Sequence, residues 1–282
     1  MGGNNNNFVY GYLENHNVDT DGMEPKEAWE EYKDMQQSGD NQEESTDDNS
    51  IKPTKESIHE KARKIAHNVN ITSDSYESLD VALNAIQKLV DQYGIDKLRC
   101  IETVDIIPGF GPSNPAAIID GGLYISNNFL KNPSRLYDIT NKIWRNDVAT
   151  EYKNARMMFD FADNFDVQTK QVLTLDLIRA SLSMKFSSQS VCYKNCEIEC
   201  VINHEIGHVL LNRYIDRDDS KYKIIENKFY RAIYYGNIFS LSRRALDNPK
   251  EFIAEAFSLY CHCKKTGDII PSFLNNILKE II

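Results

Sequence analysis

The sequence predicts an α+β fold, in which a small β-sheet or hairpin is followed by a mostly helical body. Two changes of hydrophobic periodicity lead to this prediction. Apolar residues repeat with helical spacing over 76–93, whereas residues 98–107 (LRCIETVDII) alternate as they do in a β-strand. Helical periodicity returns near residue 134 and continues to the end of the chain. A short group of strands between helical regions is typical of α+β proteins.

The expected elements begin near Ile51, with a helix over 54–68. A second helix, over 76–93, is followed by Gly94, which suits the left-handed cap of a helix. Residues 108–115 (PGFGPSNP) are expected to form a loop, and 116–126 (AAIIDGGLYIS) resume strand character. The two strand regions form a hairpin or lie side by side. Further helices are expected over 134–160, 166–185, 190–213, 222–236, 248–264 and 271–281.

The composition is that of a globular chain with an acidic amino-terminal segment. Of its 282 residues, 41% are hydrophobic and 26% are charged, which supports a packed core. The net charge of −10 and the pI of about 5.2 argue against nucleic-acid binding through a basic face. Residues 1–50 alone carry −11, so residues 51–282 are close to neutral.

Residues 1–50 are expected to form an acidic, Asn-rich disordered tail or linker. They contain eight Asn but only four of Leu, Ile, Val and Phe. So few apolar side chains do not offset an ordering cost of about 1–2 kcal/mol per residue. One helix-prone stretch, 25–35 (PKEAWEEYKDM), is a candidate for docking to a partner. Residues 51–282 are expected to form the folded domain.

The amino terminus and the cysteines bear on where the protein works. The first residues have neither the basic start nor the apolar run of a signal peptide, and no stretch is long and apolar enough to span a membrane. Six cysteines in 282 residues do not indicate a disulfide scaffold. We therefore expect a cytoplasmic protein, or one that is delivered outside the cell by a non-classical route.

The motif HEIGH, at residues 204–208, indicates a metal site. On a helix, residues four apart lie on one face, so His204 and His208 can present two imidazole nitrogens to one ion. Glu205 lies one step round the helix, where its carboxylate reaches a water molecule rather than the ion. Imidazole ligands suit Zn²⁺, which takes about four donors and leaves one position for water. The plainer explanation is two unrelated histidines on a helix surface.

A site of this type needs a third protein ligand, and the best candidates lie in NPKEFIAEAFSLY (248–260). Asn248-Pro249 is a typical helix start, and Glu251 and Glu255 are four residues apart on one face of that helix. One carboxylate can bind the ion while the other orients a ligating imidazole. The alternative is that both glutamates only favour the helix start, where negative charge is stabilising.

Two groups of cysteines were weighed as further sites. Cys192, Cys196 and Cys200 are spaced by four and continue in step with His204, so one helix running through them would carry a stripe of thiols. Buried core residues are the stronger interpretation, and a second metal site or redox switch is the weaker one. Cys261-His262-Cys263 does not share a helical face and is not expected to bind metal. His16, His59 and His67 have no ligand-like companions.

The two blocks HEIGHVL and EFIAEAFSLY, with 43 residues from His208 to Glu251, resemble the anthrax lethal factor-like zinc metalloproteases, a branch of the zincins. The resemblance covers roughly residues 95–282. It implies that His204, His208 and Glu251 bind zinc, that Glu205 is the general base, and that Glu255 supports a ligand from behind. It also implies a zincin-like fold in which 116–126 form a substrate-binding edge.

One position departs from this family. Its members often carry a Tyr seven residues before the third ligand, where the hydroxyl stabilises the developing oxyanion, but position 244 here is Arg. Arg244 is the expected replacement, and Arg243, Tyr234 and Tyr235 are the alternatives. The departure puts catalytic efficiency in doubt rather than metal binding.

Two functions follow as expectations. The first is a zinc metalloendopeptidase, of the toxin or effector type, that binds a peptide or protein substrate in extended form and uses the acidic segment for delivery or partner docking. The second is a zincin-fold structural or interaction protein that retains zinc without efficient catalysis. The presence of Glu205 favours the first, because a purely structural site needs no general base.

Overall fold

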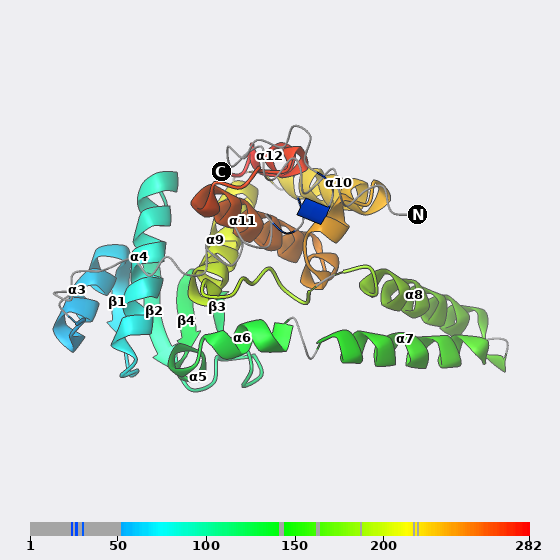
Figure 1. Ribbon diagram of the computed structural model, residues 1–282, viewed down its shortest axis with the longest axis horizontal. Coiled ribbons are helices and arrows are strands. Elements are labelled where there is room, and N and C mark those ends of the chain that lie inside the picture. The colour runs from blue at the N-terminus through cyan, green and yellow to red at the C-terminus, as the bar shows by residue number, and fades with distance from the viewer. Residues whose placement is uncertain are drawn as a thin grey trace. The chain divides into compact units, whose positions relative to one another are not determined.

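Figure 1 shows the computed structural model of the protein, which describes residues 24, 26–27, 30, 52–140, 144–161, 164–186, 188–216, 218 and 220–282. The chain divides into two units, Met1–Lys52 and Pro53–Ile282. The expectation of a disordered tail over 1–50 falls almost entirely outside the described residues. Within the helix-prone stretch, Lys26, Glu27 and Glu30 are described and helical.

The second unit has the α+β composition that the sequence predicts. Its helices and strands follow one another along the chain as Figure 1 labels them. The strands are β1 (Ala66–Asn70), β2 (Leu98–Val104), β3 (Ala116–Ile119) and β4 (Gly122–Ser126). The α-helices are α3 (Lys55–Ile65), α4 (Tyr76–Tyr93), α5 (Asn127–Lys131), α6 (Ser134–Asp138), α7 (Trp144–Asp160), α8 (Val167–Ser183), α9 (Glu197–Ile215), α10 (Ser220–Tyr234), α11 (Pro249–Thr266) and α12 (Ser272–Leu278). Two short 3₁₀ helices, η3 (Asn237–Ser240) and η4 (Arg243–Leu246), precede α11.

The four strands form one sheet in the order β1-β2-β4-β3. β1, β2 and β4 are parallel, and β3 pairs with β4 in the antiparallel direction, so β3 is an edge strand. The turn between β3 and β4 consists of Asp120 and Gly121, whose φ angles are 48° and 75°. Two successive positive φ angles are what a type I′ turn requires, and Asp-Gly is a preferred sequence for it.

Helices α9 and α11 pack against each other in the centre of the second unit. Their contact is close because a Cβ at Gly207 of α9 would lie 2.9 Å from the Cα of Ala254 in α11. Ile206, Phe252 and Phe257 are fully buried beside this contact and belong to one core that also includes the sheet. The close packing sets the distance between the motif on α9 and the carboxylates on α11.

The structure changes several expected boundaries. The helix expected over 54–68 ends at Ile65, and Ala66–Asn70 form β1 instead. The single strand region 116–126 is itself a hairpin, and its second strand lies beside β2 in the parallel direction. The helix expected over 190–213 begins only at Glu197. Within the helix expected over 134–160, the described residues form α6 and α7, and residues 141–143 lie outside the described part of the chain.

None of the helices in the described part of the chain is both long enough and apolar enough to cross a membrane.

Candidate metal centre

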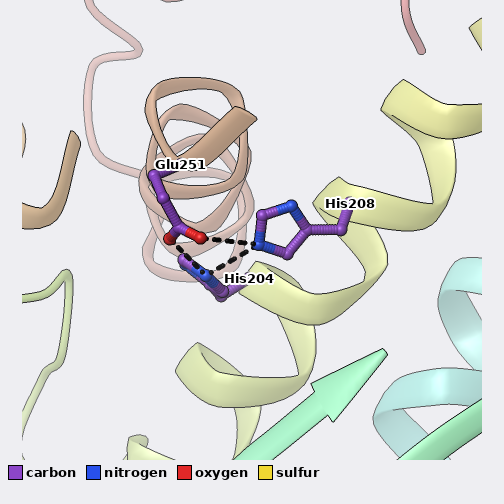
Figure 2. Close-up of side chains that lie close together, drawn as sticks. All are labelled: His204, His208 and Glu251. Atoms are coloured by element: carbon purple, nitrogen blue, oxygen red, sulfur yellow. Dashed lines mark hydrogen bonds and ion pairs between the residues drawn. The ribbon is translucent and has the colours of Figure 1, made fainter. Parts of the chain in front are cut away.

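Two helices supply the side chains of the candidate site. α9 carries His204, Glu205 and His208, and α11 carries Glu251 and Glu255. The first turn of α11 is fixed by its cap, because the side-chain oxygen of Asn248 accepts hydrogen bonds from the backbone N–H groups of Lys250 and Glu251 at 2.9 and 3.0 Å. Glu251 therefore leaves the helix at a defined position, facing α9 (Figure 2).

Figure 2 shows His204, His208 and Glu251 pointing toward one another. One ligand atom from each lies within 4.8 Å of the others. The Nε2 atoms of the two imidazoles are 3.1 Å apart. The carboxylate of Glu251 lies 3.2 Å from Nε2 of His204 and 3.5 Å from Nε2 of His208. The structure thus brings together the three residues that the sequence analysis selected as ligands.

These distances suit a single small cation. Ligand atoms about 2.0–2.1 Å from a tetrahedral ion such as Zn²⁺ are roughly 3.3 Å from one another. The separation of 3.1 Å between the two Nε2 atoms is close to that value, and each imidazole faces its own oxygen of Glu251, with Oε2 at 3.2 Å from His204 and Oε1 at 3.5 Å from His208. Two imidazoles and one carboxylate are also a donor set that divalent transition metals accept. The residues present therefore fit a metal ion.

Glu255 lies behind His204 and orients its ring. An oxygen of Glu255 is 2.9 Å from Nδ1 of His204, so Nε2 on the opposite side of the ring faces Glu251. The other oxygen of Glu255 accepts hydrogen bonds from the backbone N–H of Val191 at 2.6 Å and from the hydroxyl of Ser242 at 2.8 Å. Only 1% of Glu255 is exposed, and each of its oxygens has a partner.

The carboxylate of Glu205 faces the edge strand. Its Oε2 atom accepts a hydrogen bond of 2.8 Å from the backbone N–H of Ile118 in β3. Because the N–H of Ile118 bonds to Glu205, it points away from β4. Ile118 and Leu123, which lie opposite each other in the β3–β4 pair, therefore do not hydrogen-bond to each other. Glu205 is 4% exposed, and its position next to His204 is the one that the motif predicts.

Arg244 lies in η4 and contacts the proposed third ligand. Its Nε atom donates a hydrogen bond of 2.7 Å to Glu251. Arg243, the neighbouring cation, forms an ion pair with Asp247 instead. Tyr234, the last residue of α10, and Tyr235 after it are 83% and 64% exposed, and their rings contact each other. Of the four candidates for stabilising an oxyanion, Arg244 is the one with a contact inside the site.

Without metal, the pKa values of the two imidazoles are shifted in opposite directions. Burial lowers the pKa of His204, but hydrogen bonds with Glu251 and Glu255 outweigh it and raise the pKa to about 9. Burial, followed by the positive charge of His204, lowers the pKa of His208 to about 4. At neutral pH the metal-free site therefore has a protonated, positively charged His204 between Glu251 and Glu255, and a neutral His208.

The carboxylates respond to the same charges. Burial raises the pKa of Glu251, but its hydrogen bond with His204 and the charge of Arg244 outweigh that effect and lower the pKa to about 2. Burial raises the pKa of Glu205, and the attraction of His204 and Arg244 only partly opposes that effect. Glu251 is thus held as an anion, whereas Glu205 has the raised proton affinity that a general base uses.

The cysteines do not extend the site among the described residues. Cys192 lies in an extended segment before α9, Cys196 is its N-cap, and only Cys200 is within the helix. A continuous stripe of thiols leading to His204 is therefore absent, because α9 begins at Glu197, five residues after Cys192. No described cysteine belongs to a group of three metal-binding side chains.

Sequence reasoning missed the groups that hold the site from outside the two motifs. They are the N–H groups of Ile118 and Val191 and the hydroxyl of Ser242. Two of the three are backbone donors, which no residue type reveals. Ser242 lies in the segment between α10 and α11 that the sequence singled out for Arg244, but nothing in its spacing distinguishes it.

We compared the chain with models of protein families, with curated proteins and with solved structures, and none of them matches. The resemblance to lethal factor-like zincins therefore depends on the two sequence blocks.

Proposed function

We propose that this protein is a zinc-dependent metalloendopeptidase of the HExxH type, with a zincin-like catalytic part over residues 95–282. The observation that carries the proposal is the convergence of His204, His208 and Glu251 within 4.8 Å, next to a buried glutamate on the same helix. A structural metal site needs only ligands. A buried carboxylate beside the ligands is what hydrolysis needs in addition.

In this proposal His204, His208 and Glu251 hold the zinc ion. When bound, zinc lowers the pKa of a water molecule and polarises the carbonyl group of the substrate. Glu255 keeps the ring of His204 turned so that Nε2 remains available as a ligand atom. The ion adds positive charge to a site with three buried or half-buried carboxylates, Glu205, Glu251 and Glu255.

Glu205 moves the proton. The backbone N–H of Ile118 holds Oε2, which leaves Oε1 to accept a proton from the attacking water and deliver it to the leaving amine. The hydrogen bond also fixes the direction of the carboxylate before substrate arrives. Arg244 supplies the positive charge that stabilises the developing oxyanion, in place of the tyrosine of the related family.

The substrate is an extended peptide that pairs with β3. The N–H of Ile118 points away from β4, so this side of β3 is the outer edge of the sheet. An extended chain adds a strand to such an edge through main-chain hydrogen bonds. This arrangement places the peptide alongside Glu205. The acidic segment 1–50 serves delivery or partner docking, as in a toxin- or effector-type protease.

A second candidate is a zincin-fold structural or interaction protein that keeps zinc only for its fold. Arg244 favours it, since this residue replaces the expected tyrosine and gives its Nε donor to Glu251. An arginine used in this way shields a ligand and leaves less of its charge for an oxyanion. Both candidates bind zinc, so a metal assay does not separate them.

A peptide-library assay with a matched variant separates the two candidates. Glu205→Gln keeps the size of the side chain and removes the base, so we expect equal zinc content in both proteins and cleavage only by the wild type. Mass spectrometry of the digests and metal analysis provide the two readouts. Cleavage at an equal rate by the variant would exclude Glu205 as the base, and no cleavage by either protein would favour the structural candidate.

A further inference from the structure

A pocket of about 460 Å³ lies at the amino-terminal end of β3 and is lined by α5, α6 and the loop before the strand. Pro115, three residues before Ile118, forms part of its wall. Its backbone oxygen accepts a hydrogen bond of 2.9 Å from the N–H of Ser126, at the end of β4. Three residues of a strand span about 10 Å, which is the distance along β3 from the contact with Glu205 to this pocket.

The pocket is positively charged. Lys131 at the end of α5 and Arg135 in α6 both line it, and none of its lining residues is Asp or Glu. Within the described ranges, neither of these two cations forms an ion pair with a carboxylate. Phe129 and Leu136 form an apolar part of the wall beside them.

One residue of the pocket wall has a donor without a partner. The side-chain nitrogen of Asn114 is buried and has no hydrogen-bond acceptor among the described residues. A buried amide N–H that lacks an acceptor costs free energy, which a ligand oxygen recovers. Two cations beside an apolar wall in one cavity match a carboxylate, and Asn114 of the same wall has an N–H donor to spare.

We propose that this pocket is a specificity site for an acidic side chain of the substrate. The inference depends on the proposed protease function, because it is the peptide on β3 that brings the side chain to the pocket. Antiparallel pairing runs the substrate in the opposite direction to β3, so residues toward Pro115 are carboxyl-terminal to the cleaved bond. The preferred substrate therefore carries Asp or Glu about three residues after the cleaved bond.

A set of otherwise identical peptides tests this site. Each peptide carries Glu or Gln at one position from four residues before to four residues after the cleaved bond. We expect Glu to raise kcat/KM about tenfold over Gln at the third position after that bond, because two cations and an amide contact the carboxylate. The double substitution Lys131→Gln and Arg135→Gln should abolish the difference. Lys153→Gln, on exposed α7, is the control.

A binding measurement keeps the test independent of turnover. Fluorescence anisotropy with the Glu205→Gln variant should give tighter binding of the Glu peptide than of the Gln peptide by a similar factor. The charge-reversed variant Lys131→Glu and Arg135→Glu should prefer Lys at that position. Failure of the wild type to cleave any peptide would count against the protease, whereas cleavage without an acidic preference, or a preference that survives both substitutions, would overturn the pocket.

Discussion

Glu255 orients a side chain of the candidate site although it is not one of the three candidate ligands. A fully buried carboxylate is costly unless its oxygens are paired, and Glu255 has three partners: His204, Val191 and Ser242. Burial raises the pKa of Glu255, but the hydrogen bond with His204 and the two other donors outweigh it and lower the pKa. The carboxylate is therefore charged, and it holds the imidazole in one orientation.

The substitution Glu255→Gln tests this role. A glutamine amide places an NH₂ group among donors, so one contact with His204, Val191 or Ser242 is lost. We expect the zinc dissociation constant to rise about 10–100-fold, as measured by competition with a chromogenic chelator. Glu60→Gln, on the exposed face of α3, is the matched control. An unchanged affinity in the Glu255 variant would show that the ring is oriented by something else.

Cys192 links a buried thiol to the pH dependence of stability. Burial, followed by the nearby charge of Glu197, raises the pKa of Cys192 to about 12. In the unfolded chain this thiol ionises near pH 8.5, whereas in the folded protein it stays protonated. Above pH 8.5 the unfolded state therefore binds fewer protons than the folded state, and stability falls as the pH rises.

From pH 8 to pH 10 this single thiol should remove about 2 kcal/mol from the free energy of unfolding. Urea denaturation at the two pH values measures the change. Cys192→Ala has no thiol to ionise, so its loss over the same interval should be smaller by that amount. Equal losses in the two proteins would mean that Cys192 is accessible enough to ionise in the folded state.

At the scale of elements, the site depends on how closely α11 approaches α9. Gly207 allows that approach, since any side chain there would meet the backbone of Ala254 and the Cβ of Phe257 at 2.9 and 3.2 Å. The glycine lies between Glu205 and His208, in one of the two variable positions of the motif. It has no role as a ligand, yet it sets where Glu251 stands relative to both imidazoles.

Gly207→Ala should move α11 away from α9 by a few tenths of an ångström. We expect a loss of about 1–3 kcal/mol in the free energy of unfolding, because the helices are overpacked, together with weaker zinc binding. Urea denaturation and chelator competition measure the two effects. Gly111→Ala provides the comparison, since nothing lies within 4 Å of a Cβ at Gly111 and the change should be silent. A stable variant with normal zinc affinity would contradict this account.

Helices and strands that are determined by their own residues could be predicted from the sequence. Those that depend on contacts with residues far along the chain could not. The helix over 76–93 was found with its bounds because its apolar spacing and Gly94 lie within the element. β1 was missed because AHNVN has only two apolar residues and depends on pairing with β2, some 30 residues away. The β3–β4 turn was missed although Asp120-Gly121 is a hairpin signal, since 116–126 was treated as one strand.

In the candidate site, too, local patterns were predictable and distant contacts were not. His204, Glu205 and His208 are a local pattern on one helix, and Glu251 and Glu255 are a local pattern on another, so sequence reasoning selected both. The hydrogen bond from Ile118 to Glu205 joins residues 87 positions apart and comes from the backbone. The stripe of cysteines does not form, because Asn195 adopts a positive φ of 63° and the helix starts after it, whereas the interpretation as buried core residues is confirmed for Cys192 and Cys200.

At the scale of the whole molecule, the candidate ligands lie inside a core that is shared by the sheet and the helices. Phe252 and Ile253, next to Glu251, and Ile206, between the histidines, are fully buried members of that core. A metal ion that joins α9 to α11 therefore connects two of its main layers. Without the ion, the cationic partners of the buried carboxylates among the described residues of the site are His204 and Arg244, since the lowered pKa of His208 keeps that ring neutral.

Metal removal should consequently destabilise the second unit as a whole. An ion that binds the folded state alone contributes about 4 kcal/mol when its free concentration is a thousand times the dissociation constant. For a unit of this size such a contribution raises Tm by roughly 10 °C. We expect differential scanning calorimetry to show a drop of that order when EDTA is added, and recovery when zinc is restored. The double variant His204→Ala and His208→Ala should melt at one temperature under all three conditions. A wild-type Tm that ignores the chelator would mean that the ion, if bound, does not hold α9 and α11 together.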